Sequence, residues 1–125
     1  MVRARAIYCG GGTAEVAAGP CSLTVERRDT DGRKWSCPVE LLAASLASCI
    51  TLTLAAVADS KGIKFNSLEV EVEVCGEERR ISAVIRVGGN LTEREKKILL
   101  NSAKHCEVSK FLKEPVAFEL AFTRL

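Results

Sequence analysis

Two of the six cysteines, Cys49 and Cys106, lie in sequence settings that could support thiol chemistry. Cys49 lies in SLASCITL, among small residues that leave space around its sulfur. Cys106 lies in KHCEVSKFL, beside His105, the only histidine. A thiolate is a nucleophile and can be oxidised to a sulfenic acid or a disulfide. A buried cysteine is often only a small hydrophobic residue, and spacing alone does not pair these two.

Three of the remaining four cysteines are expected to be structural, and Cys37 is considered separately as a partner for Cys49. Cys37 would lie at a helix N-terminus, where a thiolate is stabilised. Twelve helical residues at about 1.5 Å each would place it roughly 18 Å from Cys49. A disulfide needs Cα atoms within about 7 Å, so the two cannot bond within one chain. The other three, Cys9, Cys21 and Cys75, fall on or beside expected strands.

No sequence pattern indicates a cofactor or a metal. The chain has no CxxC pair, and a site of His105, Cys106 and Cys9 would lack ligand-like spacing. Two roles stay open for His105: lowering the pKa of the neighbouring thiol, or an exposed position near a helix end. The start of the chain, MVRARAIYCGGG, lacks the apolar core of a signal peptide. We therefore expect a cytoplasmic protein with reduced thiols.

Composition predicts one globular domain, residues 1–125, because 47% of the residues are apolar and 27% are charged. The net charge is only +2, and basic and acidic residues are interspersed along the chain. This balance argues against nucleic acid or an anionic membrane as partner. Residues 41–58 carry no charge and reach the lower length limit of a membrane span. They are rich in alanine, serine and threonine and are flanked by Glu40 and Asp59, so we predict a buried helix.

Apolar alternation and glycine-containing turns predict three strands in the first part of the chain, at residues 2–8, 13–18 and 21–26. A polar loop over residues 27–36 leads to a long helix that begins at Pro38 and ends at residue 60 or 61. Pro38 suits the first turn, and Glu40 can reach back to the cap. Gly62 is placed to end the helix.

The second half predicts a hairpin, two helical segments and a final strand. LEVEVEV and residues 79–87 alternate as a strand pair with one charged face, where Arg79, Arg80 and Arg86 could balance the glutamates. Thr92 and Glu95 form a capping box for a helix over residues 93–104, followed by a helical turn near residues 108–112. The last strand would carry Phe118, Leu120 and Phe122 on one face. The fold class is α+β. One sheet covers one side of the long helix and a second copy of the chain could cover the other, so we expect a homodimer.

Two motifs resemble the OsmC/Ohr family, the osmotically inducible protein C and organic hydroperoxide resistance group. Residues 38–49, PVELLAASLASC, resemble the start of that family's central helix with its reactive cysteine. The stretch from Cys106 to Ser109 resembles the family's second "Cys-x-Val-Ser" setting. The resemblance covers essentially the whole chain. It implies an OsmC-like fold, with antiparallel sheets around a long central helix, in an intertwined homodimer.

The resemblance also implies a two-cysteine peroxidase for organic hydroperoxides. Cys49 would attack the O–O bond and become a sulfenic acid, and Cys106 would resolve it to a disulfide that an external dithiol reduces. The best-studied Ohr pattern has an arginine near the N-terminus and a glutamate ten residues before the reactive cysteine. Here Glu40 stands one position later, and one helical residue is about 100° of rotation. Capping the helix is an equally good role for it.

The chain has no arginine in its glycine-rich turn where Ohr proteins carry one. The candidates for this role are Arg3, Arg5, Arg27, Arg28 and Arg33. These departures favour a divergent OsmC-like branch, and they leave a second reading open. In that reading the protein is non-catalytic and either binds a small apolar ligand or senses oxidants through a reversible disulfide.

Overall fold

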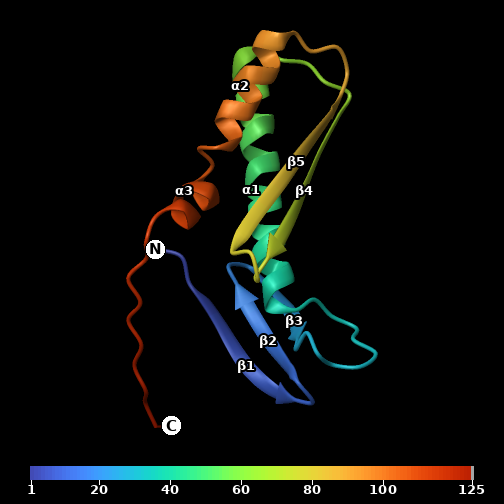
Figure 1. Cartoon of the computed structure of the whole chain (residues 1–125). Helices are drawn as coiled ribbons and strands as arrows, with labels where there is room; N and C mark the ends of the chain where they lie inside the picture. Colours follow the sequence, from blue (N-terminus) through green and yellow to red (C-terminus); the bar gives the residue numbers. More distant parts are fainter. Residues whose placement is uncertain (125) are drawn as a thin grey trace. The chain divides into compact units, whose positions relative to one another are not determined.

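The computed structural model describes residues 1–124 and has an α+β fold (Figure 1). In chain order its elements are β1 (Ala4–Gly10), β2 (Thr13–Ala18), β3 (Cys21–Glu26), α1 (Pro38–Lys61), β4 (Ser67–Cys75), β5 (Arg80–Gly88), α2 (Glu93–Ala103) and α3 (Glu107–Lys113). One sheet has the order β1-β2-β3, and the second pairs β4 with β5. The predicted element order is confirmed as far as α3, with ends that differ by one or two residues.

The chain divides into two compact units. The first comprises Met1–Ala44 and Val74–Arg80, and the second comprises Ser45–Glu73 and Ile81–Leu125. Each unit is described on its own below. The single domain expected from composition stays a prediction.

The first unit is built on an antiparallel meander. Ala4 of β1 lies opposite Ala18 of β2, and Ala18 in turn lies opposite Cys21 of β3. The turn between β1 and β2 needs glycine, because Gly11 and Gly12 have φ of 62° and 77°, where side chains with a Cβ are strained. Strand β3 carries the meander's buried residues at its end, so it leads directly into the loop before α1.

The second unit has its core on one stripe of α1. The buried residues of α1 recur every fourth position, which is one face of a helix. They pack in one cluster with the buried residues of α2 and with Cys106. Half-buried side chains of β4 and β5 pack against this cluster, and Figure 1 shows the hairpin running beside α1. Helix α1, which carries Cys49, and the segment that carries Cys106 are thus held together by shared apolar contacts.

The predicted helix ends are confirmed. Glu40 accepts a hydrogen bond from the Cys37 N–H at 2.9 Å, which caps the start of α1. Gly62 has φ of 69°, and the Ile63 N–H donates to the Ala58 carbonyl at 2.9 Å, which closes the C-terminus. Thr92 and Glu95 form the expected capping box of α2. Local sequence chemistry therefore sets the lengths of both helices.

The charged face of β4 is solvated, as predicted. Arg86 of β5 forms ion pairs with Glu69 at 3.0 Å and with Glu71 at 2.9 Å. All three side chains are more than half exposed, so each pair contributes little to stability. Arg80 pairs instead with Glu78 in the turn. The charged row thus serves register and solubility rather than a binding site.

The predicted burial of α1 is only partly met within one chain. By length and composition α1 could cross a membrane, but a core helix of a soluble protein passes the same test. In its most apolar window, 22% of the residues are buried. Leu52 is 70% exposed, although it lies between the buried Ile50 and Leu54. One face of an apolar helix is therefore uncovered in the single chain.

The expected last strand is wrong for the single chain. Residues 115–124 have no strand or helix assigned, although Phe118, Leu120 and Phe122 alternate as a strand would. Their side chains are 84%, 93% and 98% exposed. A strand exists only when a neighbour satisfies its backbone groups. Among the described residues, this segment is paired with no strand, so its apolar pattern alone does not form one.

Candidate thiol redox site

Cys49 lies in the middle of α1, where its side chain is half-buried. It packs against the core cluster of the second unit. Its sulfur accepts a hydrogen bond from the Val108 N–H at 3.5 Å, which brings the first turn of α3 beside the middle of α1. The sulfur is therefore held at a defined place next to α3 while part of the side chain stays accessible.

Cys106 is the N-cap residue of α3 and is only 2% exposed. Its sulfur accepts a hydrogen bond from the Ser109 N–H at 3.4 Å. The thiol donates to the Ser109 hydroxyl at 3.1 Å, and that hydroxyl donates to the Ala103 carbonyl at 3.4 Å. The "Cys-x-Val-Ser" stretch is thus a local capping structure that fixes the second thiol.

The two thiols are neighbours in the second unit. The Cys49 side chain packs against the core cluster that contains Cys106, and it acts to lower the pKa of Cys106. Burial acts to raise the pKa of Cys106, but its interactions with the Ser109 hydroxyl and N–H, with Cys49 and with the Val108 N–H lower it. The net result is a pKa below the ordinary thiol value. The structure therefore brings together the two cysteines that the sequence alone could not pair, and it favours the thiolate of one.

All six cysteines are free thiols. Cys49 and Cys106 form a reduced pair beside the apolar core of the second unit. A thiolate next to a second thiol can undergo oxidation to a sulfenic acid and then to a disulfide. The geometry therefore defines a candidate two-thiol site in the second unit.

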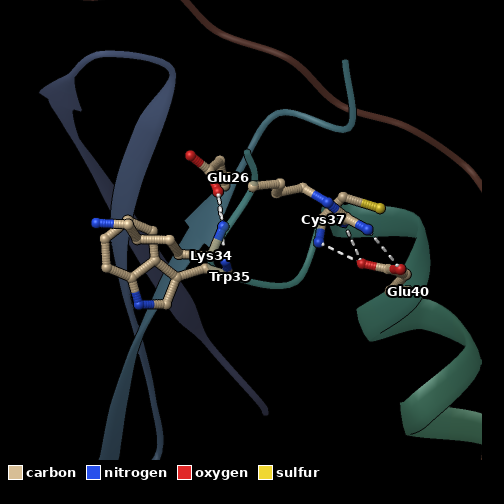
Figure 2. A network of polar contacts seen from close by, with 6 residues as sticks. Glu26, Lys34, Trp35, Cys37 and Glu40 are labelled. Atoms are coloured by element: carbon tan, nitrogen blue, oxygen red, sulfur yellow. Dashed lines mark hydrogen bonds and ion pairs between the residues drawn. The ribbon is translucent and has the colours of Figure 1, made fainter. Parts of the chain in front are cut away.

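Glu40 makes its contacts within the first unit. Its carboxylate forms a two-pronged ion pair with Arg33, with Nη2 to Oε2 at 3.0 Å, and it also accepts from the Cys37 N–H (Figure 2). Arg33 and then the Cys37 N–H lower the pKa of Glu40 from 4.5 to about 2. Glu40 is therefore ionised at neutral pH and paired with a guanidinium. Its assignment as an activating residue for Cys49 stays a prediction.

Among the five candidate arginines, Arg33 forms an ion pair with Glu40. Arg33 lies in the loop before α1, and its guanidinium is paired with Glu40, which raises its already high pKa. Cys37 is 1% exposed, and its backbone N–H donates to Glu40 of this pair. Sequence reasoning missed this arrangement because a loop arginine has no spacing rule. A polar loop ending in a capped helix was the only available signal.

Two other contributors were also missed. Ser109 was noted only as part of a motif, whereas its hydroxyl and N–H both contact the Cys106 sulfur. Glu26 was read only as the end of a strand, whereas it is a buried carboxylate at the base of the Arg33 loop. Within residues 1–124 no cluster of three or more potential ligands could hold a metal ion. His105 is exposed.

The fold and this site define an α+β protein with a paired-thiol redox centre. Residues 30–121 match the sequence model of the family described as OsmC-like protein. The chain belongs to the OsmC-like protein family, as the resemblance predicted. A comparison with curated proteins gave no match.

Solved structures share the fold. An OsmC-like protein from Mycoplasma pneumoniae is 19% identical, with a TM-score of 0.77 over 90% of this chain and 87% of that one. A protein from Psychrobacter arcticus described as an osmotic stress induced and detoxification response protein is 25% identical, with a TM-score of 0.69 over 89% and 88%. An organic hydroperoxide resistance protein from Elizabethkingia anophelis is 22% identical, with a TM-score of 0.65 over 90% and 88%.

Proposed function

We propose that the protein is a thiol peroxidase that reduces organic hydroperoxides through Cys49 and Cys106. The observation that carries the proposal is the proximity of these two thiols, next to the apolar core of the second unit. Structural relatives bear names that refer to organic hydroperoxide resistance. A paired thiol beside an apolar surround suits a peroxide with an organic substituent.

In the first step the Cys49 thiolate attacks one oxygen of the hydroperoxide. The O–O bond breaks, the leaving alkoxide takes a proton to become an alcohol, and Cys49 becomes a sulfenic acid. The Cys106 thiolate then attacks the Cys49 sulfur, so that an S–S bond forms and the S–O bond breaks. The hydroxide that leaves takes a proton to become water. An external dithiol supplies two electrons and two protons to restore both thiols.

Ser109 and Val108 support this chemistry at the sulfur atoms. The hydrogen bonds from Ser109 favour the Cys106 thiolate, which is the attacking form in the second step. The Val108 N–H donates to the Cys49 sulfur and would favour negative charge there. The proposal needs no cofactor or metal, because thiol and disulfide exchange carries all the electrons.

Arg33 and Glu40 are assigned the activating role in this proposal. They form a guanidinium and carboxylate pair of the composition that the family resemblance implies, and Glu40 is ionised at neutral pH. Arginine suits the task because its fork can hold a carboxylate and still present donors to an oxyanion. The proposal thus assigns to Arg33 the activating role for which the sequence offered five candidate arginines.

The working form in this proposal is a cytoplasmic homodimer. The exposed face of α1 and the alternating apolar residues of segment 115–124 are two surfaces that a second copy could cover. Burial of such apolar area favours association by about 25 cal/mol per Å². In such a dimer, apolar residues of the second copy would also add to the apolar surface available to the substrate.

The experiment is disulfide mapping after one pulse of oxidant. The reduced protein is mixed with a slight excess of cumene hydroperoxide and mapped by non-reducing peptide mass spectrometry, with Cys49→Ser and Cys106→Ser alongside. The expected result is a rapid bridge between Cys49 and Cys106 that neither variant forms. Cys75→Ser is the matched control and should keep the bridge. A Cys49 that stays a free thiol while peroxide remains would refute the proposal.

A second function is favoured by one observation: the Glu40 carboxylate already caps α1 and binds Arg33. If that is its whole role, the thiol pair would act as an oxidant sensor without turnover. Repeated peroxide additions with a dithiol present separate the two. A disulfide that forms once, with no sustained peroxide consumption, supports the sensor, whereas turnover that depends on both cysteines supports the peroxidase.

A further inference from the structure

Glu26 is a buried carboxylate at the end of β3, with 6% of its surface exposed. Its Oε1 accepts from the Lys34 N–H at 2.8 Å and from the Trp35 N–H at 3.3 Å (Figure 2). Its own N–H donates to the Ser36 carbonyl at 3.0 Å. Three hydrogen bonds thus join one residue of the sheet to three consecutive residues at the far end of the loop.

Such a residue is expensive for the fold. Burying a carboxylate costs several kcal/mol unless hydrogen bonds replace its water. In the part of the chain that the structure describes, Glu26 is the one buried side chain of polar or charged type, and its carboxylate accepts from two backbone N–H groups. A neutral apolar residue could end a strand at no such cost. The two acceptor contacts of the carboxylate offset part of this cost and hold the loop.

The contacts of Glu26 close the base of the loop that carries Arg33. At the loop's start, the Arg27 N–H donates to the Gly12 carbonyl at 2.9 Å. At its end, Glu26 holds the N–H groups of Lys34 and Trp35. Arg33 directly precedes this clamp, and its guanidinium reaches the Glu40 carboxylate in the first turn of α1 (Figure 2). The two residues that follow Arg33 in the chain are thus fixed by one buried side chain.

We propose that Glu26 is a positioning residue that clamps residues 34 and 35 so that Arg33 is held against Glu40. Its catalytic meaning rests on the proposed function, because that assigns the Arg33 and Glu40 pair to the thiol chemistry. The clamp concerns only the structure of the loop, so it can be tested through the titration of Glu40 without any catalytic turnover.

The direct test is the titration of Glu40, followed by the side-chain carboxyl signal in carbon NMR and assigned with Glu40→Gln. In the unchanged protein the pKa of Glu40 is expected at about 2. In Glu26→Ala the loop is released, Arg33 separates from Glu40, and the pKa of Glu40 should rise toward its ordinary 4.5. In Glu26→Gln the amide oxygen still accepts both N–H groups, so the value should stay low.

Two further variants keep the test decisive. Glu15→Ala is the matched control, because Glu15 is an exposed carboxylate of the same sheet that accepts from Thr24; it should leave Glu40 unchanged. If Glu26→Ala does not fold, Glu26→Asp replaces it, since a side chain one methylene shorter cannot hold both N–H groups. A folded Glu26→Ala or Glu26→Asp protein in which Glu40 titrates as in the unchanged chain would overturn the inference.

Peroxide kinetics then separate this inference from the proposed function. The rate of Cys49 oxidation by cumene hydroperoxide should fall by on the order of tenfold to a hundredfold in Glu26→Ala, because displacing a catalytic group by about 1 Å has effects of that size. The rate should recover in Glu26→Gln. If the Glu40 signal shifts as expected but neither the unchanged protein nor any variant consumes peroxide, the clamp is supported and the peroxidase proposal fails. If peroxide is consumed but Glu40 does not shift, the peroxidase proposal stands and the clamp fails.

Discussion

The N–H of Val108 donates to the sulfur of Cys49 at 3.5 Å, although the two residues lie in different helices, α3 and α1. This contact places the first turn of α3 over the middle of α1. Because Cys106 is the N-cap of the same short helix, its sulfur is carried to the same spot. A single helical turn thus brings the second thiol to the first, and the position of α3 controls both the pairing and the stability of the site.

Replacing Cys106 tests the capping role and the resolving role together. Cys106→Ala removes the acceptor for the Ser109 N–H and should lower the free energy of unfolding by about 1 kcal/mol, as the loss of a cap does. Cys106→Ser keeps an acceptor at this position and should be close to the unchanged protein. Urea unfolding measures both. After peroxide treatment, both variants should accumulate sulfenic or sulfinic acid at Cys49 by mass spectrometry, and equal stability of the two would contradict the cap.

Ser109→Ala should raise the pKa of the Cys106 thiol, because it removes the hydroxyl that favours the thiolate. At a given pH below that pKa, less thiolate is present, and disulfide formation after a peroxide pulse should slow. The Cys106 Cβ signal in carbon NMR, followed against pH, measures the shift. Ser102→Ala is the control, since that hydroxyl donates to the Ile98 carbonyl at 2.8 Å within α2. An unchanged Cys106 titration in Ser109→Ala would contradict the assignment.

The Glu40 carboxyl predicts an acid-sensitive contribution to stability. Its pKa is lowered from 4.5 to about 2 by Arg33 first and by the Cys37 N–H second. A carboxyl whose pKa is lower in the folded state than in the unfolded state stabilises the protein at pH values above the unfolded-state pKa. That contribution is lost as the pH falls through the folded-state pKa. Stability should therefore decline between pH of about 4.5 and about 2. Solvent screens this exposed pair, so the slope should be shallow.

Chemical unfolding across that pH window provides the measurement, with Glu40→Gln as the comparison. The difference in unfolding free energy between the two proteins should shrink as the pH falls. Arg33→Ala should move the Glu40 titration toward higher pH, since it removes the main cause of the shift. A pH-independent difference between Glu40→Gln and the unchanged chain would show that the ion pair does not titrate as described.

Leu52→Asp tests the homodimer. Leu52 is 70% exposed on α1 within one chain, so an aspartate there costs little if the protein is a monomer. If a second copy covers this face, the substitution buries an unpaired charge and should dissociate the dimer. Equilibrium sedimentation at micromolar concentration reports the mass of both proteins. Ser60→Asp, an exposed position near the end of the same helix, should leave the association intact.

A monomeric unchanged protein would overturn the dimer proposal. The same experiment bears on segment 115–124, whose apolar residues are exposed in one chain. If this segment pairs as a strand in the assembly, its amides should exchange slowly with solvent in the unchanged protein and rapidly in Leu52→Asp. Fast exchange in both would leave the last strand predicted from the alternation without support.

The sequence by itself determined the local elements of this protein. Glycine turns, the capping box of Thr92 and Glu95, and the alternation in LEVEVEV act over a few residues, so their structural outcome follows from the chain's own chemistry. The same patterns, with the resemblance, identified Cys49 and Cys106 as the residues to watch. What they could not supply was the distance between two thiols on separate elements.

Only the tertiary structure decided the partners. The proximity of Cys106 to Cys49, the pairing of Arg33 with Glu40, and the burial of Glu26 all depend on how the elements pack. Alternation likewise did not make a strand of residues 115–124, since no neighbour within the described chain pairs with them. The physical reason is that side-chain chemistry at a site, and strand pairing alike, require groups distant in sequence to be brought together. Apolar packing does this, and it leaves no signature in local spacing.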